Sequence, residues 1–279
     1  MRNSILAIAC ATMLAACGDA GGDLDSDDGA PAETIENASF KARQATAEAP
    51  RKVLAEELLI RERSPTLQFS WRAPPELAEH PQLLDELRAQ AQAQLANMRK
   101  DAREFAQTLV ETEQSPRPLF YEQVWTVAYN SPGLLNLRSH TESYHGGAHG
   151  LSSFDSVFWD KQTGRRIEPS ALFVNWPEAR AELEAAYCEE LDRMRAERRG
   201  APVGAGSVEG AEEDPFNECP PLADQPLALD SGAGSNLMAF EVLLAPYEAG
   251  PYAEGEYEVR VPATDGLRDA VKAAYLRAP

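Results

Sequence analysis

Residues 120–159 read FYEQVWTVAYNSPGLLNLRSHTESYHGGAHGLSSFDSVFW. The first ten are rich in aromatic and β-branched side chains, which predicts a strand. The turn residues NSPG follow, and residues 134–144 then predict a second strand that completes a hairpin. A third strand is predicted at 152–159, after the glycine-rich segment HGGAHG. Alternation places four residues of the first strand on one face: Tyr121, Trp125, Val127 and Tyr129.

Two stretches outside this region have apolar residues at steps of three and four, which predicts amphipathic helices. The first helix is expected to begin near Pro81 and to run for roughly 28 residues. The second begins near Pro177, which suits a first helical turn, and ends near Arg198. The apolar stripe of the first comprises Leu84, Leu87, Ala91, Leu95, Met98, Ala102, Phe105 and Leu109. The stripe of the second comprises Leu183, Tyr187, Leu191 and Met194.

Strands and helices alternate without a strict βαβ rhythm, which favours an α+β fold with antiparallel sheets and packed helices. We expect two lobes, an N-terminal one over residues 55–150 and a C-terminal one over 151–279. Thr264 or Asp265 is expected to cap a last helix that carries Leu267, Val271 and Tyr275. The remaining predicted strands are residues 58–60, 67–71, 227–229, 236–244 and 257–261.

The N-terminus has the pattern of a secretory signal over residues 1–16, with Arg2 followed by an apolar run. Leu14-Ala15-Ala16-Cys17 resembles a bacterial lipobox, which implies that Cys17 becomes the lipidated first residue. An ordinary cleaved signal is the alternative. Lipidation would place the protein in a bacterial cell envelope, anchored by acyl chains only. Gly18, rather than an acidic residue, favours the outer membrane, facing the periplasm.

Residues 17–50 form the expected tether between this anchor and the folded part. Seven acidic residues and no basic one lie between Cys17 and Glu36, in a segment too polar to fold by itself. The whole chain has a formal net charge of −19, and −13 remains on residues 37–279 (25 basic against 38 acidic side chains). This charge argues against nucleic acid and favours a cationic partner, unless it serves only solubility.

Four cysteines are present, of which Cys10 lies in the signal and Cys17 is the anchor. Cys188 and Cys219 remain as a pair in an oxidising compartment, where a disulfide is expected. The alternative is two buried free thiols. A disulfide would fasten the segment after a loose loop back onto the second helix.

Three histidines, His140, His145 and His149, fall within ten residues, but the spacing does not match a zinc motif. Gly146, Gly147, Ala148 and His149 are better explained as a structural motif, a tight turn with close approach of the backbone. Nucleophile, phosphate-loop and dinucleotide motifs are not found, and nothing selects a pair of carboxylates. We therefore expect neither catalytic residues, nor a metal, nor a cofactor.

Ser143-Tyr144-His145-Gly146-Gly147-Ala148-His149-Gly150 resembles the Tyr-x-Gly-Gly-Ala-His signature of the RsiV-like and PdaC-like extracytoplasmic domain family. The resemblance extends over roughly residues 55–276 and includes the segment APYEAGPYAEG at 245–255. It implies a two-part α+β receptor-like module. In the sigma-regulator branch the module senses lysozyme by binding it, and in the other branch it accompanies a separate deacetylase domain. Neither accompanying region is recognised in this sequence.

These features favour an envelope lipoprotein that binds, and inhibits, a lysozyme-like muramidase, either a host lysozyme or a cell-wall toxin. In the second case it would be an immunity protein. The expected contact residues are Pro246, Tyr247, Glu248, Pro251, Tyr252 and Glu254. A purely structural turn is the alternative for this loop. The alternative functions are a peptidoglycan-binding or envelope-assembly module and, less favoured, a wall-polymer hydrolase.

Overall fold

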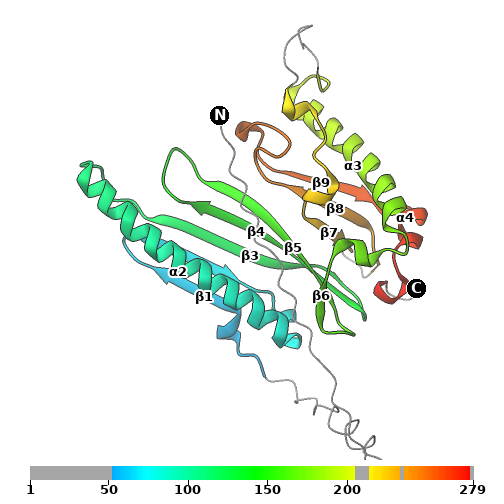
Figure 1. The fold of residues 1–279 in the computed structure, drawn as a ribbon, viewed down its shortest axis with the longest axis horizontal. Helices are drawn as coiled ribbons and strands as arrows, with labels where there is room; N and C mark the ends of the chain where they lie inside the picture. The colour runs from blue at the N-terminus through cyan, green and yellow to red at the C-terminus, as the bar shows by residue number, and fades with distance from the viewer. Residues whose placement is uncertain (1–51, 205–213, 233–235, 277–279) are drawn as a thin grey trace, which may run out of the picture. The chain divides into compact units, whose positions relative to one another are not determined.

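The computed structural model describes residues 52–204, 214–232 and 236–276, which all belong to one compact unit. The expected signal, Cys17 and the tether up to residue 50 lie outside the described residues. The described part contains two sheets with packed helices, so the α+β expectation is confirmed (Figure 1). None of its helices is both long and apolar enough to cross a bilayer.

The larger sheet has six strands in sequence order, and neighbouring strands pair along it. All pairs are antiparallel except β2 and β3, which are parallel. This departs from the expected antiparallel sheet because the connection between these two strands contains a helix of 31 residues, long enough for a crossover. The strands are β1 (Leu59–Arg63), β2 (Leu67–Arg72), β3 (Leu119–Asn130), β4 (Leu134–Tyr144), β5 (Leu151–Asp160) and β6 (Arg165–Ile167).

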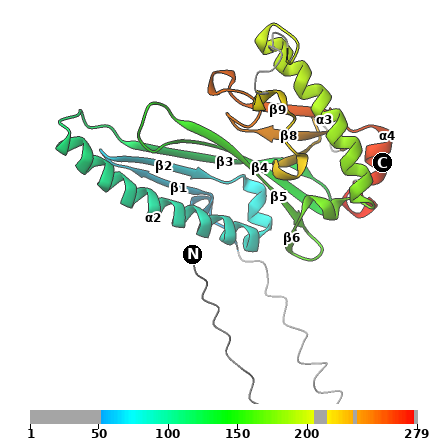
Figure 2. The ribbon, with the colours of Figure 1, turned by 45° about the horizontal axis from the view of Figure 1, so that its top comes forward.

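The crossover helix α2 (Pro81–Glu111) packs its apolar stripe on one face of this sheet, along the side of β1 and β2 (Figure 2). Pro81 occupies the first helical turn, where its missing N–H costs nothing. Phe105 is only partly buried, whereas the rest of the predicted stripe is buried. Burial of each of its leucines contributes about 1.5–3 kcal/mol.

The second sheet is antiparallel and consists of β7 (Leu227–Asp230), β8 (Ala239–Leu244) and β9 (Tyr257–Pro262). Helix α3 (Trp176–Arg199) covers it and completes a second hydrophobic core. The buried face of α3 continues from Leu191 to Arg195, while the predicted Met194 is only partly buried. A charged residue therefore takes the last buried position of the stripe.

The last helix is shorter than predicted, since α4 (Asp265–Ala270) ends before Val271. Its start is as expected, because the Thr264 hydroxyl accepts from the Leu267 backbone N–H at 3.1 Å. After α4 the chain forms a bridge with Phe173, and the Lys272 N–H donates to the carbonyl of Leu172. These tertiary hydrogen bonds replace the helical ones.

A β-bulge in β3 changes the face that its last residues present. The register with β4 shifts between Val127 and Tyr129. Tyr121 and Trp125 therefore lie in the core under α2, whereas Tyr129 lies in the second core. The prediction that Tyr129 shares their face was wrong, because a bulge adds one residue and reverses the alternation after it.

The two sheets are connected by alternate residues of β4. Asn136 is fully buried, and its Oδ1 accepts from the Leu229 N–H of β7 at 2.8 Å. Arg138 forms ion pairs of 2.7 Å with Glu241 of β8 and with Glu258 of β9. Because β5 pairs with β4 along its length, the larger sheet includes strands on both sides of the lobe boundary expected after residue 150.

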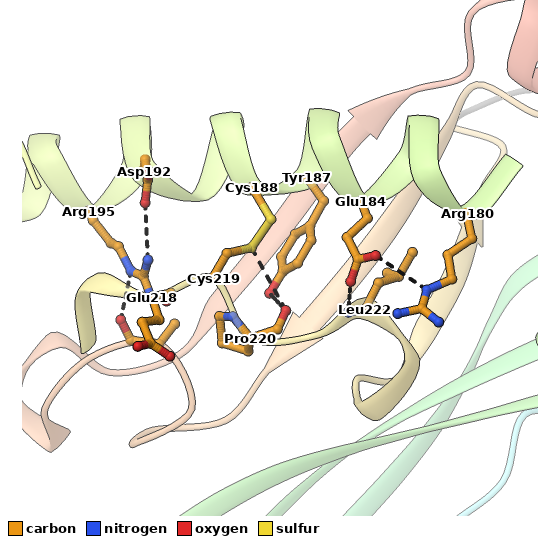
Figure 3. The surroundings of a disulfide bond; sticks show 11 residues. Arg180, Glu184, Tyr187, Cys188, Asp192, Arg195, Glu218, Cys219, Pro220 and Leu222 are labelled. Atoms are coloured by element: carbon orange, nitrogen blue, oxygen red, sulfur yellow. Dashed lines mark hydrogen bonds and ion pairs between the residues drawn. A yellow bond between two sulfur atoms is a disulfide. The ribbon is translucent and has the colours of Figure 1, made fainter. Parts of the chain in front are cut away.

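The expected disulfide is present and joins Cys188 on α3 to Cys219 (Figure 3). Further contacts hold the same segment along the helix. The Tyr187 hydroxyl donates to the Pro220 carbonyl at 3.1 Å, and the Glu184 carboxylate accepts from the Leu222 N–H at 2.9 Å. These contacts hold residues 219–222 against α3. These residues follow the stretch 205–213, which lies outside the described residues.

We predict that replacing both cysteines by alanine lowers the free energy of unfolding by about 3–4 kcal/mol, because the 31-residue separation closes a long loop in the unfolded chain. Denaturant unfolding with and without a reductant measures this effect. The reductant should destabilise the natural protein to the level of the variant and leave the variant unchanged. Equal stability of the two proteins under oxidising conditions would contradict the prediction.

Candidate functional site

Two segments that the sequence analysis singled out lie side by side, although about a hundred residues separate them. The imidazole of His149, from the glycine motif, stacks on Tyr252 with ring centroids 3.9 Å apart. Tyr247 completes the group, at 5.7 Å from Tyr252 and 6.4 Å from His149. We call these three residues the aromatic cluster.

The aromatic cluster lies at the surface. Tyr247 is 49% exposed and Tyr252 is 39% exposed, and His149 is exposed as well. Tyr247 also has a φ of +77°, a region that non-glycine residues rarely occupy. Such strain persists only where the surrounding structure imposes it, and it is enriched at functional sites.

The glycine motif sets the position of His149. Gly146 has a φ of +94°, and a Cβ atom there would lie 2.8 Å from the Phe105 ring of α2. The Tyr144 hydroxyl donates to the Gly147 carbonyl at 3.1 Å. His149 donates from Nδ1 to the carbonyl of Gly150 at 2.8 Å, which leaves Nε2 of the neutral ring as an acceptor for the Tyr247 hydroxyl. The motif therefore makes the tight turn with close approach that its glycines predict.

Helix α3 holds the loop that carries the two tyrosines, residues 245–256, which we call the tyrosine loop. The fully buried Arg195 donates from Nε to the Ala249 carbonyl and from Nη2 to the Glu218 carbonyl, both at 2.8 Å. Its neighbour Arg198 lies over the ring of Tyr257, at 3.8 Å from the centroid. Arg195 therefore holds both the loop and the segment that carries the disulfide.

Glu254 closes the loop from the inside. Its carboxylate accepts from Arg199 at 2.8 and 3.1 Å and from the Tyr257 hydroxyl. Burial alone would raise the pKa of Glu254, but the hydrogen bonds from Arg199 and Tyr257 and the nearby positive charge hold that pKa below its usual value. A Cβ atom on Gly250 would collide with this carboxylate, so a side chain there would displace it from Arg199.

A half-open hollow of about 280 Å³ adjoins the aromatic cluster at Tyr252. Leu151 on its wall is exposed, and Glu142 and Glu256 supply carboxylates. Glu256 lies 2.7 Å from Nε2 of His140, which secures the end of the loop to β4. The surface around the cluster therefore combines aromatic rings, one aliphatic side chain and acidic groups.

The expected contact residues divide into two groups. Tyr247, Glu248, Pro251 and Tyr252 are exposed, and Pro246 is half-buried. Glu254, in contrast, has a side chain only 15% exposed and acts within the molecule.

The three clustered histidines do not converge. His140 contacts Glu256 and His149 contacts the tyrosines, and among the described residues no group of three or more His, Cys, Asp or Glu could hold a metal ion.

The sequence analysis did not identify the arginines of α3 as supports of this site. Arg195 was detectable, because it follows Leu191 by four residues and so continues the apolar stripe of the helix. A charge at such a position is rarely buried without partners. One partner, the Asp192 carboxylate, lies three residues earlier on the helix. The two backbone carbonyls that Arg195 also reaches are distant in sequence and leave no trace in the sequence pattern.

We predict that Glu254→Gln lowers the free energy of unfolding at pH 7 by about 1–3 kcal/mol, because Arg199 loses its charged acceptor. Since the pKa of Glu254 is lowered on folding, its contribution is complete above about pH 4.5 and is lost as the pH falls through the folded value. Unfolding curves between pH 7 and pH 3 should therefore converge for variant and natural protein.

The matched control is Glu248→Gln, which changes an exposed glutamate of the same loop. It should leave the unfolding curve unchanged across this range. A Glu254→Gln variant that matches the natural protein at pH 7 would show that the ion pair does not hold the loop.

Comparison with known proteins finds one family model, described as Deacetylase PdaC, that matches residues 60–152. The match begins in β1 and ends at the start of β5, so it includes the glycine motif but not the tyrosine loop. No curated protein matches the chain.

Two crystal structures of DUF3298 family proteins are similar to it. The protein from Pseudomonas aeruginosa PAO1 is 15% identical, with 76% of this chain and 88% of that chain covered and a TM-score of 0.42. The protein from Bacteroides fragilis NCTC 9343 is 14% identical, with 77% and 92% covered and a TM-score of 0.46. By sequence, residues 60–152 are similar to the domain that the PdaC family model describes.

Proposed function

We propose that this protein is an envelope lipoprotein, anchored through Cys17, that binds a lysozyme-like muramidase and inhibits it. The contact surface is the aromatic cluster together with Glu248 and Pro251. The observation that carries the proposal is the exposure of two tyrosines on a loop that is held rigidly from behind.

Tyrosines on a preorganised loop suit a protein partner. Tyr is enriched at binding hot spots, since it offers a large contact area with few rotatable bonds. Arg195 and Arg199 hold the loop in one conformation before binding, which reduces the entropy lost on association. The lysozyme-sensing branch of the family that the sequence resembles supports the choice of partner.

The charge of the folded part supports the same choice. Residues 37–279 carry 25 basic against 38 acidic side chains, a balance that attracts cationic proteins, and many lysozymes are cationic. Such long-range attraction raises the association rate at low ionic strength. Contacts made by the aromatic cluster would, in contrast, persist at high salt, because apolar burial is not screened.

We propose a binding role rather than a catalytic one. Two carboxylates of this region are engaged within the molecule, Glu254 with Arg199 and Glu256 with His140, while Glu248 is exposed to solvent. A general acid or base must be able to exchange a proton with a substrate, which such pairing opposes.

We predict that the detergent-solubilised full chain binds at least one lysozyme-like muramidase and suppresses its hydrolysis of cell walls. Calorimetric titration at low and high salt measures binding, and turbidity of a wall suspension measures hydrolysis. Replacing Tyr247 and Tyr252 together by alanine should weaken binding at least about 30-fold, because a hot-spot side chain contributes about 2 kcal/mol or more.

The matched control replaces Val110 and Val174 by alanine, since both are highly exposed apolar residues outside the loop. This variant should bind as the natural protein does. Binding that disappears at high salt would show that charge alone supports the interaction. Equal losses of affinity in the two variants would exclude the aromatic cluster as the contact surface. Wall binding without muramidase binding would favour the peptidoglycan-binding alternative.

The lipid anchor has a separate test. We predict that Cys17→Ser moves the protein from the membrane fraction to the soluble fraction of the envelope, because the sulfur atom to which the lipid would be attached is lost. Metabolic labelling with a palmitate analogue should mark the natural protein and not the variant. Labelling that persists in Cys17→Ser would contradict the assignment.

A further inference from the structure

A second hollow, of about 310 Å³, lies between α2 and strands β3, β5 and β6. Eight side chains on its wall carry polar or charged groups: Gln90, Gln94, Tyr121, Gln123, Trp125, Asp155, Ser156 and Arg166. Its volume is at the lower end of the range for small-molecule sites, about 300–1,000 Å³. It lies on the sheet face that carries α2 and is thus separate from the aromatic cluster.

The hollow exists because the sheet face under α2 changes character from one side to the other. Apolar residues of β2 pack against the helix, whereas on β3, β4 and β5 the same face carries polar residues such as Gln123, Ser139 and Asp155 among its apolar ones. The pairing places Trp125, Ser139 and Asp155 in one row across these strands. Ser139 is buried, and its hydroxyl lies 3.3 Å from Nε2 of Gln123. Buried polar groups in place of apolar ones keep this part of the face from closing against α2.

Several groups on the wall have hydrogen-bonding capacity to spare. Trp125 is only 4% exposed, and its indole N–H has no partner among the described residues. A buried donor without a partner is costly, and a ligand acceptor that reached this N–H after a small shift of the wall would recover part of that cost. Within the same described set, Gln94 and Asp155 make no side-chain hydrogen bond, so an amide and a carboxylate are available beside the indole.

The charges around the hollow disfavour an anion. Arg166 is already paired with Glu86, at 2.8 Å, and Asp155 adds a negative charge. The rest of the wall offers amides that both donate and accept, one acceptor carboxylate and the aromatic surface of Trp125. Groups of this kind match a ligand with many hydroxyl groups and an apolar ring face.

We propose that this hollow binds an uncharged saccharide of one or two rings. Asp155 and Gln94 accept from and donate to its hydroxyl groups, and Trp125 contributes the apolar wall. The site does not depend on the proposed binding of a muramidase, because no residue of the aromatic cluster takes part in it.

Fluorine NMR of the full chain labelled with 5-fluorotryptophan tests the proposal, with the Trp125 signal assigned from Trp125→Phe. The probes are N,N′-diacetylchitobiose, cellobiose and maltose, with glucose 6-phosphate as the anionic comparison. We expect a saturable shift of the Trp125 signal with at least one neutral sugar and a weaker response to the phosphate. Preference for diacetylchitobiose would point to an amino-sugar polymer as the natural source, and preference for a glucose disaccharide to a neutral glucan.

Two variants complete the design. Asp155→Asn and Gln94→Ala should each weaken sugar binding about tenfold, the effect of losing a hydrogen bond to a charged or buried group. Gln92→Ala, an exposed glutamine on the same helix, should not change it. The absence of a saturable shift with every sugar, equal effects of Gln94→Ala and Gln92→Ala, or tighter binding of the phosphate would each overturn the proposal.

Discussion

Alternate residues of β4 determine how the two sheets of this protein fit together. Asn136, Arg138 and His140 point to the same face of the larger sheet and bond to β7, to β8 and β9, and to Glu256 respectively. A shift of one residue in the pairing of β4 would turn all three to the opposite face. Glu256 immediately precedes β9, at the end of the tyrosine loop. Its bond to His140 therefore also positions this loop next to the glycine motif.

The energetic weight of these three contacts differs. Asn136 is fully buried, so water could not take the place of its hydrogen-bond partners. Loss of any of these bonds would therefore leave a buried polar group unpaired, which is costly. The ion pairs of Arg138 retain partial contact with solvent, which weakens them. A small apolar contact between Phe154 and Leu243 lies beside them and excludes water from the junction. Asn136 therefore specifies the fit, and the charges reinforce it.

Most of the elements could be predicted from the sequence, because each depends on a local pattern. Steps of three and four identified α2 and α3, and alternation identified β3, β4 and β5. The errors occurred where distant contacts decide the outcome. The bulge after Val127 depends on the pairing with β4, and the early end of α4 depends on hydrogen bonds to residues 172–174. Neither of these partners is visible within a short window of sequence.

The same distinction applies to the candidate sites. Turn chemistry singled out the glycine motif, and the family resemblance together with its two tyrosines singled out the tyrosine loop. The stacking of His149 on Tyr252, in contrast, is a product of the junction between the sheets. The arginines of α3 were missed for the same reason, since Arg195 reaches two backbone carbonyls and Arg199 reaches the Glu254 carboxylate, all of them distant in sequence. The row of Trp125, Ser139 and Asp155 under α2 was also missed. A single polar residue such as Ser139 or Asp155 within a predicted strand looks like an ordinary exposed position.

The two sites occupy opposite faces of one sheet, and this has a physical consequence for how they could influence each other. Trp125 and Asp155 face α2, while His140 and Phe154, next to them in sequence or pairing, face the second sheet. No side chain lines both hollows, so the two proposed ligands would not compete for the same side chains. Coupling would require a second arrangement of the strands themselves, and the buried Asn136 opposes any such rearrangement. The larger sheet thus acts as a rigid partition, and binding energies on its two faces should add independently.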